Sequence, residues 1–422
     1  MCVGARHDDI MSPAHYREFA KLVGIELKTS MNEEGVAKAE SEILNEINLA
    51  RIRDTDLRDH YNKSNLSLEW HHLEYVERSY RKFKEAHELM DFTDLLIKVV
   101  MNPSLLPNLD TVIIDEAQDL SRLQWEIVEH LAKKCKHVYL AGDDDQAIFR
   151  WAGSDVESFL NFEGTVQVLQ QSYRVPQRVH DMANEVITRL KHRQEKVWKA
   201  REFEGEIFHY HSFEYAPVQD GQWLIMAATN YMLEPIQEWL RDLGMLFEVR
   251  GSLSISRTIL TAVYAWERLR AGKSIIGEQV AMIYQYMGPD GVAKGHKKFK
   301  HGDPNGMYDM ATLKEQFGLQ VDGPWMDALE KIGLERSVYL SAMLRRGVRF
   351  NDEPRIKLST IHGAKGGEAD NVLLLTDLSP KFIEECAKDD SDMLRLLYVG
   401  LTRTRKTLHI VLPKNRERSF PV

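Results

Sequence analysis

The chain has 422 residues, enough for two or three domains, and its 43% hydrophobic and 28% charged content excludes a disordered or fibrous protein. A net charge of −9 argues against binding nucleic acid through overall positive charge, although an acidic protein can still carry a basic groove. Cys2, Cys135 and Cys386 are far apart, which argues against a disulfide framework or a cysteine zinc site. No apolar run approaches the roughly 18 residues of a membrane span, so we expect a cytoplasmic protein.

The first part of the chain predicts helices. From about Ser12 to Glu88, apolar residues recur at helical spacing among many charges, with little strand signal. The pattern changes at "TVIIDEA" (Thr111–Ala117), which predicts a strand. A helix with a capping box at Ser121 and Gln124 follows, and "KHVYLAGD" (Lys136–Asp143) predicts a second strand. A strand, a crossover helix and a strand form a parallel α/β unit, in which ligands bind at the carboxyl ends of the strands.

Further strands and helices predict a second α/β unit. Strands are predicted in 165–174, 206–212, 222–230, 355–363, 371–377 and 407–413, with a helix from Gln177 to Lys191. Residues from about Lys273 to Gly347 predict mostly helix, interrupted by a glycine- and lysine-rich stretch (287–306) that is the candidate flexible loop. We therefore predict an α/β fold with a helical insertion and with its last strands at the C-terminus.

The first predicted strand ends in a carboxylate pair. After a strand, Asp115 can hold Mg²⁺ on a nucleotide's phosphates and Glu116 can orient or deprotonate water, although such a pair alone is more often a solvated acidic patch. The next strand ends in "GDDDQAIFRWAG" (Gly142–Gly153). There Gln146 can contact both a phosphate and a water, and the aromatic residues Phe149 and Trp151 can stack on bases. The alternative is an acidic loop followed by core aromatics.

Three later segments carry further candidates. Tyr173 can stack on adenine and Arg174 can reach phosphates, but this pair alone has little weight. Backbone amides and a lysine in the glycine-rich turn of "STIHGAKGGEAD" suit phosphates of a nucleotide or of a DNA strand; its candidates are Thr360, His362, Lys365, Gly366 and Glu368. An apolar helix then leads to Arg403 and Arg405, where an arginine finger could be mounted.

Together these segments resemble a known family. "VIIDEAQD", "GDDDQAIFRWAG", "QSYR", "STIHGAKGGEAD" and "LLYVGLTRTR" are similar, in order, to motifs II to VI of UvrD/Rep/PcrA-type superfamily 1A DNA helicases, and "DFTDLL" (Asp91–Leu96) resembles the segment before motif II. The resemblance implies two RecA-like parallel-sheet domains, the first N-terminally incomplete, with helical insertions. Its implied domains are a 1B-like region (1–88), domain 1A (89–164), domain 2A (165–272 and 348–422) and a 2B-like insertion (273–347). A bacterium or a phage-infected host cell is the expected source.

The resemblance also implies a role for each candidate. Asp115 would bind Mg²⁺, Glu116 would activate water, and Gln146 would sense the γ-phosphate of ATP and couple it to DNA through Trp151. Tyr173 would stack on adenine, Arg174 and the finger Arg403 would contact the γ-phosphate, and Glu368, beside Gly366, would bind the ribose. The implied contacts to DNA also include Phe149, Thr360, His362 and Lys365. The implied activity is ATP-driven 3′ to 5′ movement on single-stranded DNA that unwinds duplex DNA.

The phosphate loop that should accompany these residues is not found in the sequence. The only Gly-Lys-Ser is Gly272-Lys273-Ser274. The position five residues before Gly272 is Glu267, inside a predicted helix, and not the glycine that a phosphate loop needs. We therefore expect a helicase polypeptide that lacks motif I, which a separate chain, a split gene or a corrected start codon could supply. An ATPase-inactive DNA-binding or partner module and a metal-dependent phosphohydrolase are the alternatives. The basic stretch Lys294–His301 could contact duplex DNA or be a solvated loop.

Overall fold

The structure, a computed structural model, describes residues 6–31, 37–64, 68–300, 302–349, 351–387, 389–413 and 415–420. The chain forms two compact units. The first runs to Leu169 and also includes Arg189–Val197, whereas the second contains Gln170–Thr188 and the chain from Trp198 onward. Cys2 and His301 lie outside the described residues. Among the residues that are described, no helix combines the length and the apolar character needed to cross a bilayer.

Helices and a β-hairpin form the N-terminal part of the first unit. The elements are α1 (Pro13–Val23), β1 (Lys28–Met31), β2 (Ala37–Glu40), α2 (Glu42–Ile52), α3 (Leu57–Lys63), α4 (Trp70–Ala86) and α5 (Phe92–Met101). Ser12 caps α1, and Phe19 of α1 packs in one core with Ile47 of α2 and Leu73 of α4. The predicted helices are confirmed. The antiparallel pairing of β1 with β2 is missing from the prediction because "KTSM" and "AKAE" contain none of the β-branched or aromatic apolar residues that are typical of strands.

A buried cluster of charges joins α2, α4 and α5. Asp91, the N-cap of α5, accepts hydrogen bonds from Arg51 (2.7 Å), Lys84 (2.7 Å) and the Tyr80 hydroxyl (3.0 Å). Burial alone would raise the pKa of Asp91, but the two cations outweigh burial and hold that pKa below its ordinary value. Because removing either cation would leave a buried charge without compensation, the cluster fixes the start of the helix that precedes the strand β3.

The predicted strand–helix–strand unit is confirmed in the first unit. Strand β3 (Thr111–Ile114) pairs in parallel with β4 (His137–Leu140), and α6 (Arg122–Ala132) connects them. The predicted capping box is present, since the Ser121 and Gln124 side chains accept from each other's backbone N–H groups. The buried side chains of Trp125 and Val128 on α6 pack with Ile114 and Leu140, on one face of this sheet. On the opposite face the register partners Ile113 and Tyr139 are 74% and 58% exposed.

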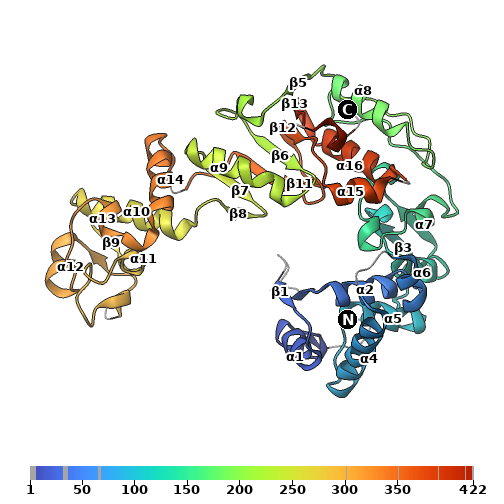
Figure 1. Cartoon of the computed structure of the whole chain (residues 1–422), viewed down its shortest axis with the longest axis horizontal. Coiled ribbons are helices and arrows are strands. Elements are labelled where there is room, and N and C mark those ends of the chain that lie inside the picture. Colours follow the sequence, from blue (N-terminus) through green and yellow to red (C-terminus); the bar gives the residue numbers. More distant parts are fainter. Residues whose placement is uncertain are drawn as a thin grey trace. The chain divides into compact units, whose positions relative to one another are not determined.

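A mostly parallel sheet, seven-stranded among the described residues, forms the core of the second unit (Figure 1). In spatial order its strands are β5 (Glu206–Tyr210), β13 (Thr404–Val411), β12 (Ala369–Leu375), β6 (Trp223–Ala227), β11 (Ile356–Thr360), β7 (Phe247–Val249) and β8 (Ser252–Leu253). Only β7 and β8 pair antiparallel within this sheet. Strand β6 is buried throughout, as expected for a central strand covered on both faces. The predicted α/β class is therefore confirmed.

The helices beside this sheet are α8 (Gln177–Ile187), α9 (Glu234–Asp242), α15 (Pro380–Cys386) and α16 (Ser391–Leu401). The helix predicted to reach Lys191 ends at Ile187, just before the chain passes into the first unit. The strand predicted in 165–174 is wrong. Only Gln171 forms an isolated bridge there, with Lys199, and Leu169 is 86% exposed. The residues of this segment favour strand structure by type, but they have no hydrophobic core to pack against.

The segment between β8 and β11 is mostly helical, and it includes residues 273–347, for which the sequence predicts mostly helix. Its elements are α10 (Arg257–Arg270), β9 (Ile275–Ile276), α11 (Gly277–Tyr286), β10 (Met307–Tyr308), α12 (Met310–Gln316), α13 (Trp325–Ala328) and α14 (Leu334–Arg345). The glycine- and lysine-rich stretch folds around the buried ring of Phe299. That ring lies 5.0 Å from those of Tyr308 and Phe317, while Lys297 and Lys300 are exposed.

A buried histidine in the sheet gives a pH prediction. His409 on β13 packs against Trp223 (4.7 Å between ring centroids) and hydrogen-bonds the Tyr210 hydroxyl (3.1 Å). Burial lowers the pKa of His409 to about 4 from 6.5. The unfolded chain therefore binds this proton more readily, so the free energy of unfolding should fall as pH decreases from about 6.5 towards 4, by up to about 3 kcal/mol.

Urea unfolding at several pH values measures this effect. Because phenylalanine cannot titrate, the free energy of unfolding of His409→Phe should depend less on pH between about 6.5 and 4 than that of the unmodified chain. Val372→Ala, in the buried neighbouring strand β12, should lower stability by a similar amount at every pH. An unchanged slope in His409→Phe would contradict the assignment.

Candidate functional site

The carboxylate pair lies where the sequence predicts, directly after β3. Both Asp115 and Glu116 are exposed, and the Glu116 backbone is left-handed (φ 51°). The Glu116 N–H donates to Asp115 Oδ1 (2.9 Å), which orients the Asp115 carboxylate at the strand end. Exposed carboxylate oxygens on a rigid strand end are suitable ligands for Mg²⁺.

A buried glutamine connects this pair to the loop after β4. Gln118 Nε2 donates to Glu116 Oε2 (2.6 Å), and Gln118 Oε1 accepts from the Asp143 N–H (2.9 Å). A Cβ at Gly142 would lie 2.5 Å from Gln118 Oε1, so the bridge requires glycine at that position. Nothing in the spacing of Gln118 along the sequence indicates that it forms this bridge. Its effect is to hold the two strand-end loops together.

Gln146 belongs to the loop after β4. Its Nε2 donates to Asp143 Oδ2 (2.7 Å). Because Asp143 is also bound by Gln118, the structure brings Gln146 to the same sheet edge as the carboxylate pair. This placement is the one that the parallel arrangement of β3 and β4 predicts.

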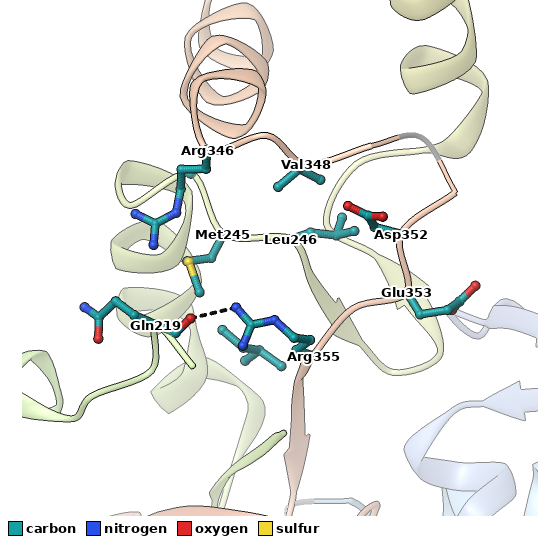
Figure 2. Close-up of a pocket in the computed structure, with 10 residues that line it drawn as sticks. Gln219, Met245, Leu246, Arg346, Val348, Asp352, Glu353 and Arg355 are labelled. Carbon is teal, nitrogen blue, oxygen red and sulfur yellow. Dashed lines mark hydrogen bonds between the residues drawn. The ribbon is translucent and has the colours of Figure 1, made fainter. Parts of the chain in front are cut away.

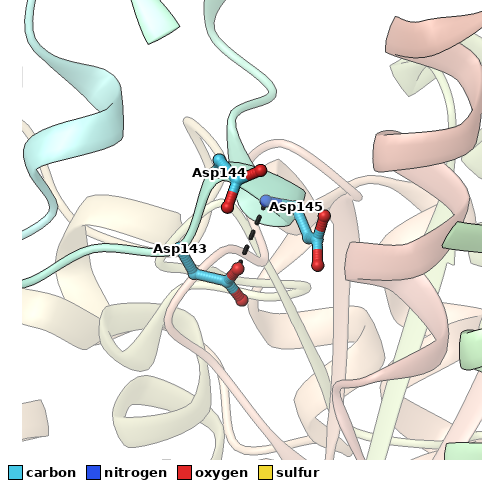
Figure 3. A group of neighbouring side chains, drawn as sticks. All are labelled: Asp143, Asp144 and Asp145. Atoms are coloured by element: carbon cyan, nitrogen blue, oxygen red, sulfur yellow. Dashed lines mark hydrogen bonds between the residues drawn. The ribbon is translucent and has the colours of Figure 1, made fainter. Parts of the chain in front are cut away.

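The Asp143–Asp145 carboxylates form a compact acidic cluster (Figure 3). It is not an open cation site, because Lys196 forms ion pairs with all three carboxylates. Burial lowers the pKa of Lys196, but the carboxylates outweigh burial and raise it, so the ammonium is charged. Burial would raise the pKa of Asp143, yet Lys196 holds it below its ordinary value. Nothing in the sequence around Lys196 indicates this role, because the contact forms only in the folded chain.

Trp151 is presented on a short turn (Arg150–Ala152) and is 64% exposed. The end of α2 holds this turn, since Arg53 Nη2 donates to the Arg150 carbonyl (3.0 Å). Gly153 closes the turn with φ 101°, and a Cβ there would lie 2.6 Å from Ile52 Cδ1. Packing against α2 thus leaves the indole facing outward, whereas Phe149 is half-buried.

In the second unit, Tyr173 and Arg174 lie in a turn before α8. The Ser172 Oγ accepts from the Arg174 N–H (3.3 Å), and the Tyr173 ring is 85% exposed. Arg174 lies 3.7 Å from Glu368, which also accepts from Arg405 Nη1 (2.9 Å). The structure therefore brings together two segments that the sequence separates by almost two hundred residues.

The two C-terminal arginines have different surroundings. Arg403 is 1% exposed; its Nε donates to the Val399 carbonyl (3.0 Å) at the end of α16. Arg405 is on the surface with Glu368. The guanidinium of Arg403 is thus buried and that of Arg405 is exposed, a difference that the "TRTR" sequence does not predict.

The glycine-rich turn connects β11 to β12. Thr360 ends β11, and its Oγ1 accepts from the Gly363 N–H (3.1 Å). Gly366 has φ 83°, a conformation that favours glycine, and it allows the tight turn before Glu368. His362 and Lys365 are half-buried in this turn.

The sequence predicts that Gly272-Lys273-Ser274 is not a phosphate loop, and the structure agrees. It follows the C-terminal end of α10, where the N–H groups of Gly272 and Lys273 donate to the carbonyls of Leu269 and Arg268. Those N–H groups are therefore used by the helix, and the partial charge of a helix C-terminus disfavours phosphate.

A cavity of about 240 Å³ lies elsewhere in the second unit, at the base of the insertion (Figure 2). Arg346 and Val348 line it from the segment after α14, and Asp352, Glu353 and Arg355 from the segment before β11. Arg355 is tied to the Gln219 carbonyl (2.7 Å). No predicted site residue lines this cavity.

Comparison with known proteins identifies two family matches. Residues 11–167 match the UvrD/REP helicase N-terminal domain, and residues 326–415 match the UvrD-like helicase C-terminal domain. An ATP-dependent DNA helicase PcrA from Bacillus subtilis is 28% identical over 228 residues, covering 50% of this chain and 30% of that protein. The PcrA of Staphylococcus aureus is 31% identical over 150 residues, covering 32% of this chain and 20% of that protein. The chain therefore matches less than a third of the length of these relatives.

The turn that carries Trp151 gives a stability prediction. Gly153→Ala should lower the free energy of unfolding of the first unit by roughly 1–2 kcal/mol, because an L-residue is strained at this φ and its Cβ collides with Ile52. Gly164→Ala is the matched control, since its Cβ would meet nothing within 4 Å. Urea unfolding of both variants measures the difference. Equal stabilities would contradict the strained-turn assignment, and an Ile52→Ala background separates collision from backbone strain.

Proposed function

This chain belongs to the UvrD/Rep family of superfamily 1 DNA helicases, and we propose that it acts as an ATP-dependent 3′ to 5′ DNA helicase or translocase. The observation that carries the proposal is the Gln118 bridge, which joins the carboxylate pair after β3 to the Gln146 loop after β4. Nucleotide hydrolysis needs an acidic pair and a neutral polar residue on adjacent strand ends, and this edge supplies them.

In the first unit, Glu116 takes a proton from the attacking water and Gln146 orients that water and contacts the γ-phosphate. Asp115 has the position and oxygen ligands to hold Mg²⁺, which when bound neutralises charge on the phosphates. Glu116 has a polar neighbour in Gln118, whose amide N–H fixes the Glu116 carboxylate. These assignments are supported by the contacts at the two strand ends.

In the second unit, Tyr173 stacks on adenine and Arg174 contacts the γ-phosphate, while Glu368 and Gly366 bind the ribose. The Arg174–Glu368 proximity (3.7 Å) supports a common site for the turn before α8 and the turn after β11. Arg403 is the proposed arginine finger. We also propose the domain division 1–88 (1B-like), 89–164 (1A), 165–272 with 348–422 (2A) and 273–347 (2B-like).

Single-stranded DNA is the proposed track, with duplex DNA the substrate of unwinding. The exposed indole of Trp151 stacks on a base, and Phe149, Thr360, His362 and Lys365 contact the strand. Trp151 lies five residues after Gln146 on one continuous loop, so a nucleotide-dependent shift of Gln146 reaches the base-stacking turn directly. Such coupling converts hydrolysis into movement.

A second candidate function is a DNA-binding module that does not hydrolyse ATP. It is favoured by the exposed indole of Trp151, which can stack on a base whether or not ATP is hydrolysed. A phosphate loop supplied by a separate chain stays a prediction, tested by adding a family phosphate-loop segment in trans to the turnover assay.

ATP turnover separates the two candidates. With single-stranded DNA and the phosphate-loop segment supplied in trans, we expect stimulated hydrolysis that falls by at least about 100-fold in Glu116→Gln, because the general base is lost while nucleotide binding remains. Glu85→Gln, an exposed glutamate on α4, is the matched control and should behave as the unmodified chain. DNA binding without stimulated turnover would support the second candidate instead.

DNA affinity tests the stacking role. Trp151→Ala should weaken binding of single-stranded DNA by about 5- to 100-fold, since base–aromatic stacking contributes about 1–3 kcal/mol. Tyr75→Ala removes another exposed aromatic of the same unit (54% exposed) and should leave affinity unchanged. Fluorescence anisotropy with a labelled oligonucleotide measures both, and equal affinities of the two variants would exclude Trp151 from the DNA contact.

A further inference from the structure

The loop after β4 carries three adjacent carboxylates, and residues 143–148 contain no cation that could compensate them. One carboxylate oxygen from each of Asp143, Asp144 and Asp145 lies within 4.8 Å of the other two, and Asp144 and Asp145 are each 1% exposed (Figure 3). Like charges this close and this poorly hydrated repel one another strongly unless cations compensate them. The loop therefore depends on positive charge from another part of the chain.

That charge comes from a segment 48 residues or more later in the chain. Arg193 binds Asp145 with two hydrogen bonds, Nε to Oδ1 (2.8 Å) and Nη2 to Oδ2 (2.5 Å). Lys196 Nζ contacts Asp144 Oδ1 (2.6 Å) and Asp145 Oδ2 (3.0 Å) and also pairs with Asp143. The ammonium of Lys196 thus occupies the centre of a group that could otherwise hold a metal ion.

We call residues 189–197 the strap. The strap belongs to the first unit, whereas the chain on either side of it, Gln170–Thr188 and Trp198 onward, belongs to the second. Besides Arg193 and Lys196, the strap offers the Gln194 N–H to Asp144 (3.0 Å). At the surface, His192 Nε2 of the strap also lies 2.8 Å from Glu157 Oε2. The largely buried cations of the strap, Arg193 and Lys196, pair with the acidic cluster.

Asp143 connects the strap to the site. Its Oδ2 accepts from Gln146 Nε2 (2.7 Å), while its Oδ1 pairs with Lys196. One carboxylate thereby holds both the side chain proposed to sense the γ-phosphate and the main cation of the strap. The path from Gln146 to the strap is two side-chain contacts long.

We propose that Lys196 and Arg193 are positioning residues for Gln146, and that the strap transmits a displacement of Gln146 to the second unit through the covalent chain. Without the cations, the carboxylates would move into solvent and take Gln146 away from the sheet edge. The catalytic consequence rests on the proposed ATP hydrolysis, whereas the pinning of the loop does not.

Hydrogen exchange of the full chain tests the pinning. In Lys196→Met the amides of 143–148 should exchange roughly 10-fold faster, because local opening becomes easier when the loop loses its cation. Lys196→Arg, which keeps the charge, should restore much of the protection. Lys136→Met is the matched control, because Lys136 pairs with Asp110 on the surface, where both side chains are more than 70% exposed. Unchanged exchange in Lys196→Met would overturn the proposal.

A double variant separates positioning from charge repulsion and protects the test against misfolding. Asp144→Asn combined with Lys196→Met leaves the net charge of the cluster unchanged while removing the Lys196 contacts; the Arg193–Asp145 pair stays. The proposal expects this variant to fold and still to exchange faster at 143–148. Protection equal to that of the unmodified chain would show that Lys196 only neutralises charge, and would overturn its positioning role.

Steady-state turnover tests the catalytic consequence. Lys196→Met should lower kcat by about 10-fold with a change in the KM for ATP of less than about 2-fold, because Gln146 acts on the transition state rather than on nucleotide binding. Lys136→Met should change neither constant. A loosened loop with unchanged kcat would overturn the link to Gln146. An unmodified chain that does not hydrolyse ATP would count against the proposed function. Hydrogen exchange alone would then test whether the strap holds the 143–148 loop in place.

Discussion

Compensation of buried carboxylates by cations from distant parts of the chain is the constraint on which the first unit depends. Asp91 obtains its cations from α2 and α4, and the Asp143–Asp145 cluster obtains them from the strap. In each case, removing a cation would leave a buried charge, which costs more than the ion pair contributes when formed. The two clusters therefore fix position rather than add much stability, and the positions that they fix are the approach to β3 and the loop after β4.

Much of the fold could be predicted from local patterns. The strands at 111–114 and 137–140, their crossover helix and the Ser121 capping box follow from periodicity and capping chemistry. Parallel pairing then predicts that polar residues after neighbouring strands share one edge, which is why the sequence alone predicts that Glu116 and Gln146 lie near each other. The same reasoning succeeds for the buried strands of the second unit, whose apolar runs are unambiguous.

Features that depend on specific long-range contacts could not be predicted. The hairpin β1–β2 lacks β-branched and aromatic apolar residues, and the 165–174 segment has strand propensity but no neighbouring strand to pair with. Gln118, Arg193 and Lys196 look like surface residues in the sequence, because only the folded chain shows which carboxylates they meet. The different surroundings of Arg403 and Arg405 likewise come from the junction of α16 with β13 and not from residue type.

The strap also has a consequence for the order of events during synthesis. The Asp143–Asp145 loop leaves the ribosome first, and Arg193 is added 48 residues after Asp145, an interval of about 2–10 s at about 5–20 residues per second. Until then the carboxylates are better solvated than buried, so the loop has no reason to close onto the sheet. The first unit therefore completes its packing only after Gln170–Thr188, a part of the second unit, has already been translated. Neither unit is the product of one uninterrupted stretch of nascent chain.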